Sequence, residues 1–103
     1  MLGITFKENC PDVRNTKVVD VIKQLKEYET NVTIYDPWAN PTEVQDEYGL
    51  TTLKDCPSKT YDAIVLTVAH HQFLELDLER LKNGNTVVYD VKGILKGKAQ
   101  AKL

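Results

Sequence analysis

The eight residues at positions 61–68, YDAIVLTV, constrain the fold more than any other stretch, because they are almost continuously apolar. A strand with one wet face alternates apolar and polar residues, whereas a continuous apolar strand is typical of one covered on both faces. We therefore expect a buried strand in a sheet that has helices on both sides.

The first part of the chain reads as a strand, a loop and a helix. Leu2 to Phe6 is a short run rich in β-formers, and a loop follows it. From Thr16 onward apolar residues recur at helical spacing, and Asn15 before them is a competent N-cap. The apolar positions of this predicted helix are Val18, Val21, Ile22, Leu25 and Tyr28.

The rest of the chain alternates in the same way. We predict strands at 31–36, 50–53 and 85–91, and a short helix at 41–48 with Pro41 in its first turn and Gly49 after its end. Residues 70–84 are helical in part and end at Gly84, and a polar tail follows residue 91. The pattern predicts one α/β domain over residues 1–103, a Rossmann-like three-layer sandwich with a mostly parallel sheet.

Composition gives no support to several classes of partner. The chain has 103 residues, of which 42% are hydrophobic and 27% charged, and its net charge is -2. This balance gives no electrostatic reason to expect nucleic acid or an anionic membrane, and no run is a membrane span or a signal peptide. Cys10 and Cys56 lack the spacing of a disulfide framework or a metal site, so we expect free thiols in a reducing, cytoplasmic compartment.

Three cations are candidates for binding phosphate. Ligands of such sheets lie at the carboxyl ends of the strands, near the switch in strand order. Phe6 and Lys7 end the first predicted strand, and Lys92 follows the last. With Arg14, these lysines are predicted at one rim beside a helix N-terminus, an arrangement suited to a phosphate or diphosphate. The alternative is that they are solvated surface charges.

Other chemistries are less well supported by the residues. Asp36 resembles the acidic residue that holds a ribose in dinucleotide-binding folds, but the first turn has no G-x-G-x-x-G, so this chain alone should not bind NAD in that mode. His70 and His71 are adjacent, and no spacing completes a metal site, so we expect them at a helix start or on the surface. Tyr35 and Trp38 are predicted to pack in the core and a turn.

Four segments together resemble a known family. They are GITFKENCPDVRNTKVVDVIKQL, VTIYDPWA, YDAIVLTVAHHQF and VVYDVKGIL. The chain is similar, over essentially its whole length, to the C-terminal domain of the nucleotide-sugar 6-dehydrogenases, which act on UDP-glucose, GDP-mannose and UDP-N-acetylhexosamines. The most specific part is F-K-x-x-x-x-D-x-R before a helix, then Y-D-P. The Cys-Pro variant FKENCPDVRNTK resembles the branch that acts on UDP-N-acetylglucosamine or UDP-N-acetylgalactosamine.

The resemblance implies roles for four residues. Phe6 and Lys7 would contact the sugar nucleotide, and Lys92 would match a basic substrate contact late in the chain. Many relatives have Arg there, and Lys supplies a point charge where Arg supplies a fork. Arg14 would reach a bound NAD from across the cleft. In the family, the whole enzyme is a homodimer or larger and oxidises the C6 alcohol to a carboxylate with two NAD.

The resemblance also implies that the chain is one domain of a larger enzyme. It has no G-x-G-x-x-G domain, no long central helix and no nucleophile motif, so we expect no catalytic residue and no metal site in it. Two other readings are weighed. A phosphoacceptor receiver domain should have an acidic pair where Phe6 and Lys7 stand, and a free-standing nucleotide-binding or regulatory α/β module remains an alternative.

Overall fold

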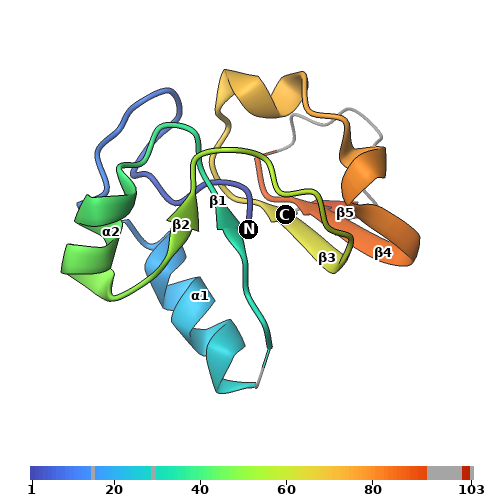
Figure 1. The fold of residues 1–103 in the computed structure, drawn as a ribbon, viewed down its shortest axis with the longest axis horizontal. Helices are drawn as coiled ribbons and strands as arrows, with labels where there is room; N and C mark the ends of the chain where they lie inside the picture. The colour runs from blue at the N-terminus through green and yellow to red at the C-terminus, as the bar shows by residue number, and fades with distance from the viewer. Residues whose placement is uncertain (15, 29, 93–100, 103) are drawn as a thin grey trace.

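The computed structural model describes residues 1–14, 16–28, 30–92 and 101–102 (Figure 1). Strands and helices alternate along the first half of the chain, and two 3-10 helices precede the long strand β4 in the second half. In chain order the elements are α1 (Val18–Glu27), β1 (Ile34–Tyr35), α2 (Pro41–Tyr48), β2 (Thr52–Leu53), β3 (Tyr61–Leu66), η1 (His71–Leu74), η2 (Leu78–Leu81), β4 (Lys82–Asp90) and β5 (Ala101–Lys102).

The strands form one parallel arrangement joined through Leu2. β1 pairs with β2, and β3 pairs with β4, which pairs with β5. Leu2 makes parallel bridges to Tyr35 of β1 and to Leu66 of β3, so the N-terminal segment lies between the two groups of strands. The spatial order is therefore β2, β1, Leu2, β3, β4, β5. All these pairings are parallel, which confirms the predicted α/β class with a mostly parallel sheet.

The strand order reverses beside the N-terminal segment. After Leu2 the chain moves through α1 and α2 to β1 and β2 on one side, and then crosses back to β3 and β4 on the other. In such sheets the crevice at this switch point, outside the carboxyl ends of the strands, is the usual ligand site. The loop that follows Leu2 lies at this place.

Two apolar clusters cover opposite faces of the sheet. In β1, Ile34 belongs to the cluster built with α1 and α2, while the next residue, Tyr35, packs against the cluster built with η1 and η2. Successive side chains of a strand point to opposite faces, so the α-helices and the 3-10 helices lie on different sides. Figure 1 shows α1 and α2 at one end of the molecule and the two 3-10 helices at the other.

Gly3 lets the N-terminal segment contribute to both clusters. Its φ of +105° is a conformation that L side chains rarely adopt. Leu2 belongs to the cluster of η1 and η2, whereas Ile4 belongs to the cluster of α1 and α2. On a regular strand two residues at this spacing would share one face. The turn at Gly3 therefore explains why the predicted strand from Leu2 to Phe6 is reduced to a bridge at Leu2.

The predicted helix at 41–48 is confirmed at both ends. Pro41 is its first residue, and the side chain of Asn40 accepts hydrogen bonds from the amides of Thr42 and Glu43. Gly49 ends the helix in the left-handed conformation. The helix predicted from Thr16 begins at Val18, whose amide donates to the Thr16 hydroxyl. Asn15, its predicted N-cap, lies outside the described residues.

Three expectations about the second half are wrong in part. β3 is not covered on both faces, because Val87 and Tyr89 of its neighbour β4 are 37% and 41% exposed and Ala63 is exposed. The predicted helix at 70–84 is two short 3-10 helices, and Gly84 lies within β4. Ala101–Lys102 pairs with β4 instead of continuing a polar tail. Residues 93–100 of that tail lie outside the described residues.

Candidate functional site

A cleft of about 300 Å³ opens at the carboxyl ends of the N-terminal segment, β3 and β4. We call it the lysine cleft. It is bounded by the loop after Leu2, the start of α1 and the ends of β3 and β4. Its lining residues are Thr5, Phe6, Lys7, Glu8, Thr16, Lys17, Val18, Thr67, Val68 and Lys92.

The lysine cleft has a net positive lining. Among the described residues that line it there are three lysines, Lys7, Lys17 and Lys92, and one carboxylate, that of Glu8. The N-terminal end of α1 adds the positive end of a helix dipole. Lysines with a helix N-terminus suit a phosphate group. Sequence reasoning named Lys7 and Lys92 and missed Lys17, although its place just before the apolar helical run was a usable signal.

Phe6 supplies the apolar part of the cleft. Its side chain is 59% exposed, which is unusual for phenylalanine, and it sits in the loop between Thr5 and Lys7. The amide of Phe6 donates to the carbonyl of Asp12 across the loop, at 2.7 Å. An exposed aromatic ring beside lysines can stack on a base or a sugar while the cations contact phosphate.

The loop is anchored by the carboxylate of Asp36, which follows β1. Asp36 is fully buried, and its Oδ2 accepts hydrogen bonds from the amides of Ile4 and Thr5 at 2.7 Å and 3.1 Å. Its Oδ1 accepts from the amides of Trp38 and Ala39. Burial opposes ionisation of this carboxyl, but hydrogen bonds from His70 and Ile4 hold its pKa below the ordinary value of 3.8. Asp36 is therefore a structural anion.

His70 completes this buried network, and its position corrects the expectation of a surface histidine. Its side chain has no exposed area, and Nε2 lies 3.0 Å from Oδ2 of Asp36 and 3.0 Å from the Thr5 hydroxyl. Nδ1 accepts a hydrogen bond from the amide of Asn9. His70 also stands at the N-cap position of η1, the predicted helix start, without a capping bond from its side chain, and its neighbour His71 is exposed.

Trp38 packs against the imidazole ring of His70. Its indole stacks on His70 with ring centroids 6.1 Å apart, and its Nε1 donates to Gln72 of η1. Tyr35 packs edge-on against the buried ring of Phe73. The predicted core and turn packing of Tyr35 and Trp38 is therefore confirmed. These contacts tie the turn after β1 to the start of η1.

Arg14 does not line the lysine cleft, so this cleft contains two of the three cations that were expected at one rim. Its guanidinium pairs with Asp12, with Nε 3.1 Å from Oδ1, and 77% of the side chain is exposed. The contact raises the pKa of Arg14 and lowers that of Asp12 through the shared side-chain hydrogen bond. Arg14 lines two other cavities, one with Glu43 and Asp46 of α2 and one with Asp20 of α1.

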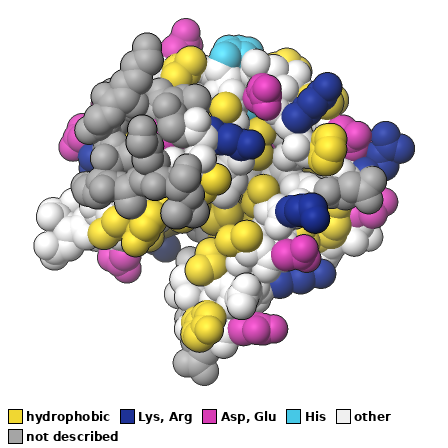
Figure 2. Space-filling model, turned by 180° about the vertical axis from the view of Figure 1, so that it is seen from behind, with side chains coloured by type: hydrophobic (Ala, Val, Ile, Leu, Met, Phe, Trp, Pro, Cys, Tyr) yellow, Lys and Arg dark blue, Asp and Glu magenta, His cyan; other side chains and the backbone are white. Residues whose placement is uncertain are grey.

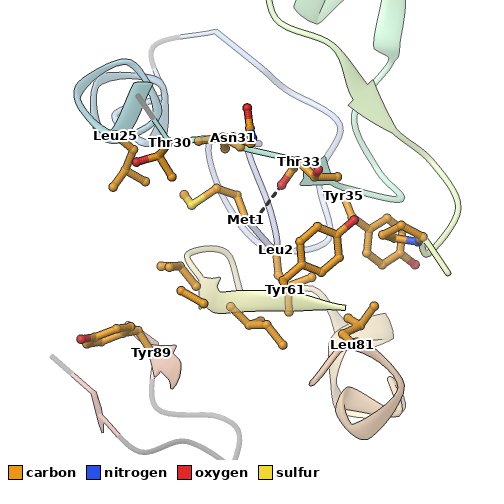
Figure 3. A pocket seen from close by; sticks show the side chains of 15 residues that line it. Met1, Leu2, Leu25, Thr30, Asn31, Thr33, Tyr35, Tyr61, Leu81 and Tyr89 are labelled. Carbon is orange, nitrogen blue, oxygen red and sulfur yellow. Dashed lines mark hydrogen bonds between the residues drawn. The ribbon is translucent and has the colours of Figure 1, made fainter. Parts of the chain in front are cut away.

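A further cavity, of about 220 Å³, lies against the open face of β3 and β4. Leu25 of α1, Val65 and Tyr89 line it, and Met1 donates to the carbonyl of Thr33 at its edge (Figure 3). Figure 2 shows hydrophobic side chains gathered around a hollow on one face of the molecule. No charged side chain of the described residues lines this cavity, in contrast to the lysine cleft.

The described residues do not form a dinucleotide site of the usual kind. Asp36, which occupies the position of a ribose-binding carboxylate, is fully buried and accepts from four amides and an imidazole. The turn after Leu2 has exposed Lys7, Glu8 and Asn9 where a glycine-rich turn would admit a pyrophosphate. In the described part of the chain, no three metal-ligating side chains gather at one point, and no helix is long and apolar enough to cross a bilayer.

A parallel sheet with a cationic cleft at its switch point is typical of α/β domains that bind phosphorylated ligands. Residues 1–97 match the sequence pattern of the UDP-glucose/GDP-mannose dehydrogenase family, UDP binding domain. The chain belongs to this family, which confirms the resemblance seen in its motifs.

Individual relatives are similar over most of the chain. It is 44% identical over 98 residues to a UDP-N-acetyl-D-glucosamine 6-dehydrogenase of Salmonella typhi and 42% identical to one of Pseudomonas aeruginosa. Each alignment covers 92% of this chain and 23% of the relative. A UDP-glucose 6-dehydrogenase of Rhizobium meliloti is 32% identical over 89 residues, which are 81% of this chain and 20% of the relative. The chain thus spans about a quarter of the length of the first two relatives.

Proposed function

We propose that this chain is the domain of an NAD-dependent nucleotide-sugar 6-dehydrogenase that closes over a UDP-N-acetylhexosamine. The parent enzyme would oxidise the C6 alcohol of the sugar to a carboxylate. The lysine cleft at the switch point is the observation on which the proposal rests, because it joins three cations, a helix N-terminus and an exposed phenylalanine. Membership of a family described by its UDP binding domain supports the same ligand.

The choice of sugar is supported by the relatives. The two UDP-N-acetyl-D-glucosamine 6-dehydrogenases are 44% and 42% identical to this chain, while the UDP-glucose 6-dehydrogenase is 32% identical. The Cys-Pro pair of the loop, Cys10 and Pro11, favours the same branch. We therefore expect a UDP-N-acetylhexosamine to be preferred over UDP-glucose.

The proposal assigns the cations to two different ligands according to their positions. Lys7 and Lys92 in the lysine cleft would contact the diphosphate, with Phe6 against the uridine or sugar. Arg14, outside this cleft and largely exposed, would contact NAD held by another part of the enzyme. NAD supplies the hydride acceptor when bound. The residues of this chain bind, orient and shield the substrate, and this alignment lowers the entropic part of the barrier.

The first test uses the parent enzyme. It should be assayed with UDP-N-acetylglucosamine, UDP-N-acetylgalactosamine and UDP-glucose, and kcat/KM should be higher for one of the acetylated sugars. A clear preference for UDP-glucose would contradict the assignment of the sugar. The parent should be a dimer or larger, which size-exclusion chromatography with light scattering would measure.

The second test uses the 103-residue chain. UDP added to the ¹⁵N-labelled protein should shift the amide signals of Lys7, Lys17 and Lys92, and uridine without phosphate should shift them much less. The chain should not reduce NAD with any UDP-hexosamine. Shifts confined to the apolar cavity around Leu25 and Tyr89, or turnover by the purified chain, would contradict the proposal.

A further inference from the structure

The hydrogen bonds of His70 define its protonation state. The amide of Asn9 donates to Nδ1 at 2.9 Å, so this nitrogen must present a lone pair. The ring hydrogen therefore sits on Nε2, where it faces Oδ2 of Asp36 and the Thr5 hydroxyl. A doubly protonated ring would point an N–H at the Asn9 N–H. The geometry thus requires a neutral imidazole with its hydrogen on Nε2.

His70 and its neighbour His71 hold both ends of a five-residue loop. Thr5 and Asn9 contact the His70 ring, and Thr5 also donates its hydroxyl hydrogen to the carbonyl of Lys7 at 3.0 Å. The side chain of Asn9 accepts from the amide of His71 at 2.9 Å. The loop residues Phe6, Lys7 and Glu8, between these anchors, are exposed and line the lysine cleft.

The loop contains one residue in the left-handed region. Asn9 has a φ of +53°, which is uncommon for a residue with a Cβ although Asn adopts it more readily than most. Such a conformation persists where surrounding contacts fix it. The ring that contacts it is itself closely packed, since His70 is fully buried, stacks on Trp38 and lies 5.4 Å from the ring of Phe73.

We propose that His70 is a positioning residue for nucleotide binding: its Nδ1 holds Asn9, and this contact preforms the loop that presents Phe6 and Lys7 to the UDP-sugar. The proposal rests on the proposed function for its ligand. A preformed loop binds without first losing the backbone entropy of its residues. His70 touches no ligand in this account, because it is buried behind the loop.

Two substitutions separate the two nitrogens of the ring. In His70→Asn the amide oxygen occupies the place of Nδ1, so the acceptor for Asn9 remains and the donor to Asp36 is lost. In His70→Gln the longer amide reaches the place of Nε2, so the donor to Asp36 remains and the acceptor for Asn9 is lost. Both variants lose the aromatic contacts with Trp38 and Phe73, so this loss of packing is common to the two and does not explain a difference between them.

The first measurement is made without ligand on the wild-type 103-residue chain. NMR of the ring nitrogens should show an unprotonated Nδ1 and a protonated Nε2 for His70. A scalar coupling across the hydrogen bond should connect Nδ1 to the amide of Asn9. A protonated Nδ1, or the absence of this coupling, would overturn the proposal, and neither result depends on a variant that folds.

The second measurement compares the variants by amide hydrogen exchange. The amides of Phe6 and Asn9 should exchange faster in His70→Gln than in His70→Asn, while the amides of β3 and β4 should differ little between them. Equal exchange at Phe6 and Asn9 in the two variants would show that Nδ1 does not order the loop. This readout involves no nucleotide.

The third measurement adds the ligand in the parent enzyme. His70→Gln should raise KM for UDP-N-acetylglucosamine by about tenfold, with a smaller change in kcat, and His70→Asn should recover most of the loss. If kcat/KM falls in each variant only in proportion to its drop in melting temperature, the role of His70 is merely structural. If the wild-type chain fails to bind UDP, the proposed function is wrong, whereas the two ligand-free measurements still decide the role of His70.

Discussion

Nε2 of His70 lies 3.0 Å from Oδ2 of Asp36, and neither side chain has any exposed area. The pair joins the end of β1 to the start of η1, 34 residues apart in sequence. Because the same carboxylate holds the amides of Ile4 and Thr5, one buried anion fixes three segments at the switch point. The loop of the lysine cleft is therefore built on a polar scaffold.

Replacing Asp36 should lower the free energy of unfolding of the protein. Asp36→Asn retains one oxygen but places an amide where N–H groups donate, leaving buried donors without an acceptor. We expect a loss of about 2–4 kcal/mol in the free energy of unfolding, measured by urea denaturation. Asp46→Asn, on the exposed side of α2, is the matched control and should change it by less than about 0.5 kcal/mol. Equal effects of the two would contradict the assigned role.

The same carboxylate predicts how stability depends on pH. Burial disfavours the charge of Asp36, yet the hydrogen bonds from His70 and Ile4 hold its folded-state pKa below 3.8. The unfolded chain therefore takes up the proton first. The stabilisation is fully present above the unfolded pKa and is lost as pH falls through the lower folded value. Urea denaturation at a series of pH values should show this decline in the wild type and a flatter profile in Asp36→Asn.

Alanine substitutions at Gly3 and Gly84 compare a position that only glycine tolerates with one that accepts a side chain. An alanine Cβ at Gly3 would lie 2.6 Å from Cβ of Val68 and would require a φ of +105°, while a Cβ at Gly84 meets no atom within 4 Å. Gly3→Ala should cost about 2–4 kcal/mol, and Gly84→Ala should change stability by less than about 0.5 kcal/mol. Thermal denaturation of both variants is the measurement. A Gly3→Ala protein as stable as the wild type would show that the turn at Gly3 does not direct Leu2 and Ile4 to different clusters.

The two phenylalanines should separate stability from binding. Phe73 is 1% exposed and packs on Tyr35, so Phe73→Ala should cost about 3–5 kcal/mol. Phe6 is 59% exposed, so Phe6→Ala should leave the melting temperature almost unchanged and weaken UDP binding to the chain. Calorimetry and UDP titration of each variant test this. A strongly destabilised Phe6→Ala protein would mean that the ring holds the loop in place.

Lys7 and Arg14 should affect different ligands of the parent enzyme. Lys7→Ala removes a charge-assisted contact, so kcat/KM for the UDP-sugar should fall roughly tenfold to a hundredfold. Arg14→Ala should raise the apparent KM for NAD more than that for the UDP-sugar. Lys54→Ala, an exposed lysine outside the cleft, is the control for lost charge.

Neither substitution should change the stability of the 103-residue chain by more than about 0.5 kcal/mol, because Lys7 and Arg14 are both exposed. A large drop in melting temperature for either variant would identify the loop as a structural clamp. The same change in both KM values for both variants would show that the two cations act on one ligand.

The sequence by itself determined the class of fold and indicated a candidate site. Apolar runs separated by helical periodicity predict a parallel α/β sheet, and this class is observed although one face of strand 61–66 is partly exposed. Local signals also placed α2, because Pro41 and Gly49 act within one or two residues of themselves. The strand-end rule then selected Lys7 and Lys92, which line one cleft.

Only the tertiary structure decided which polar residues are buried together. Thr5, Asp36 and His70 are more than thirty residues apart in sequence, and nothing local distinguishes His70, which is buried, from His71, which is exposed. Arg14 pairs with Asp12 only two residues away, but that it does not line the lysine cleft is seen only in the tertiary structure. Burial and hydrogen-bond partners depend on which segments distant in sequence pack together. Local periodicity carries no information about that packing.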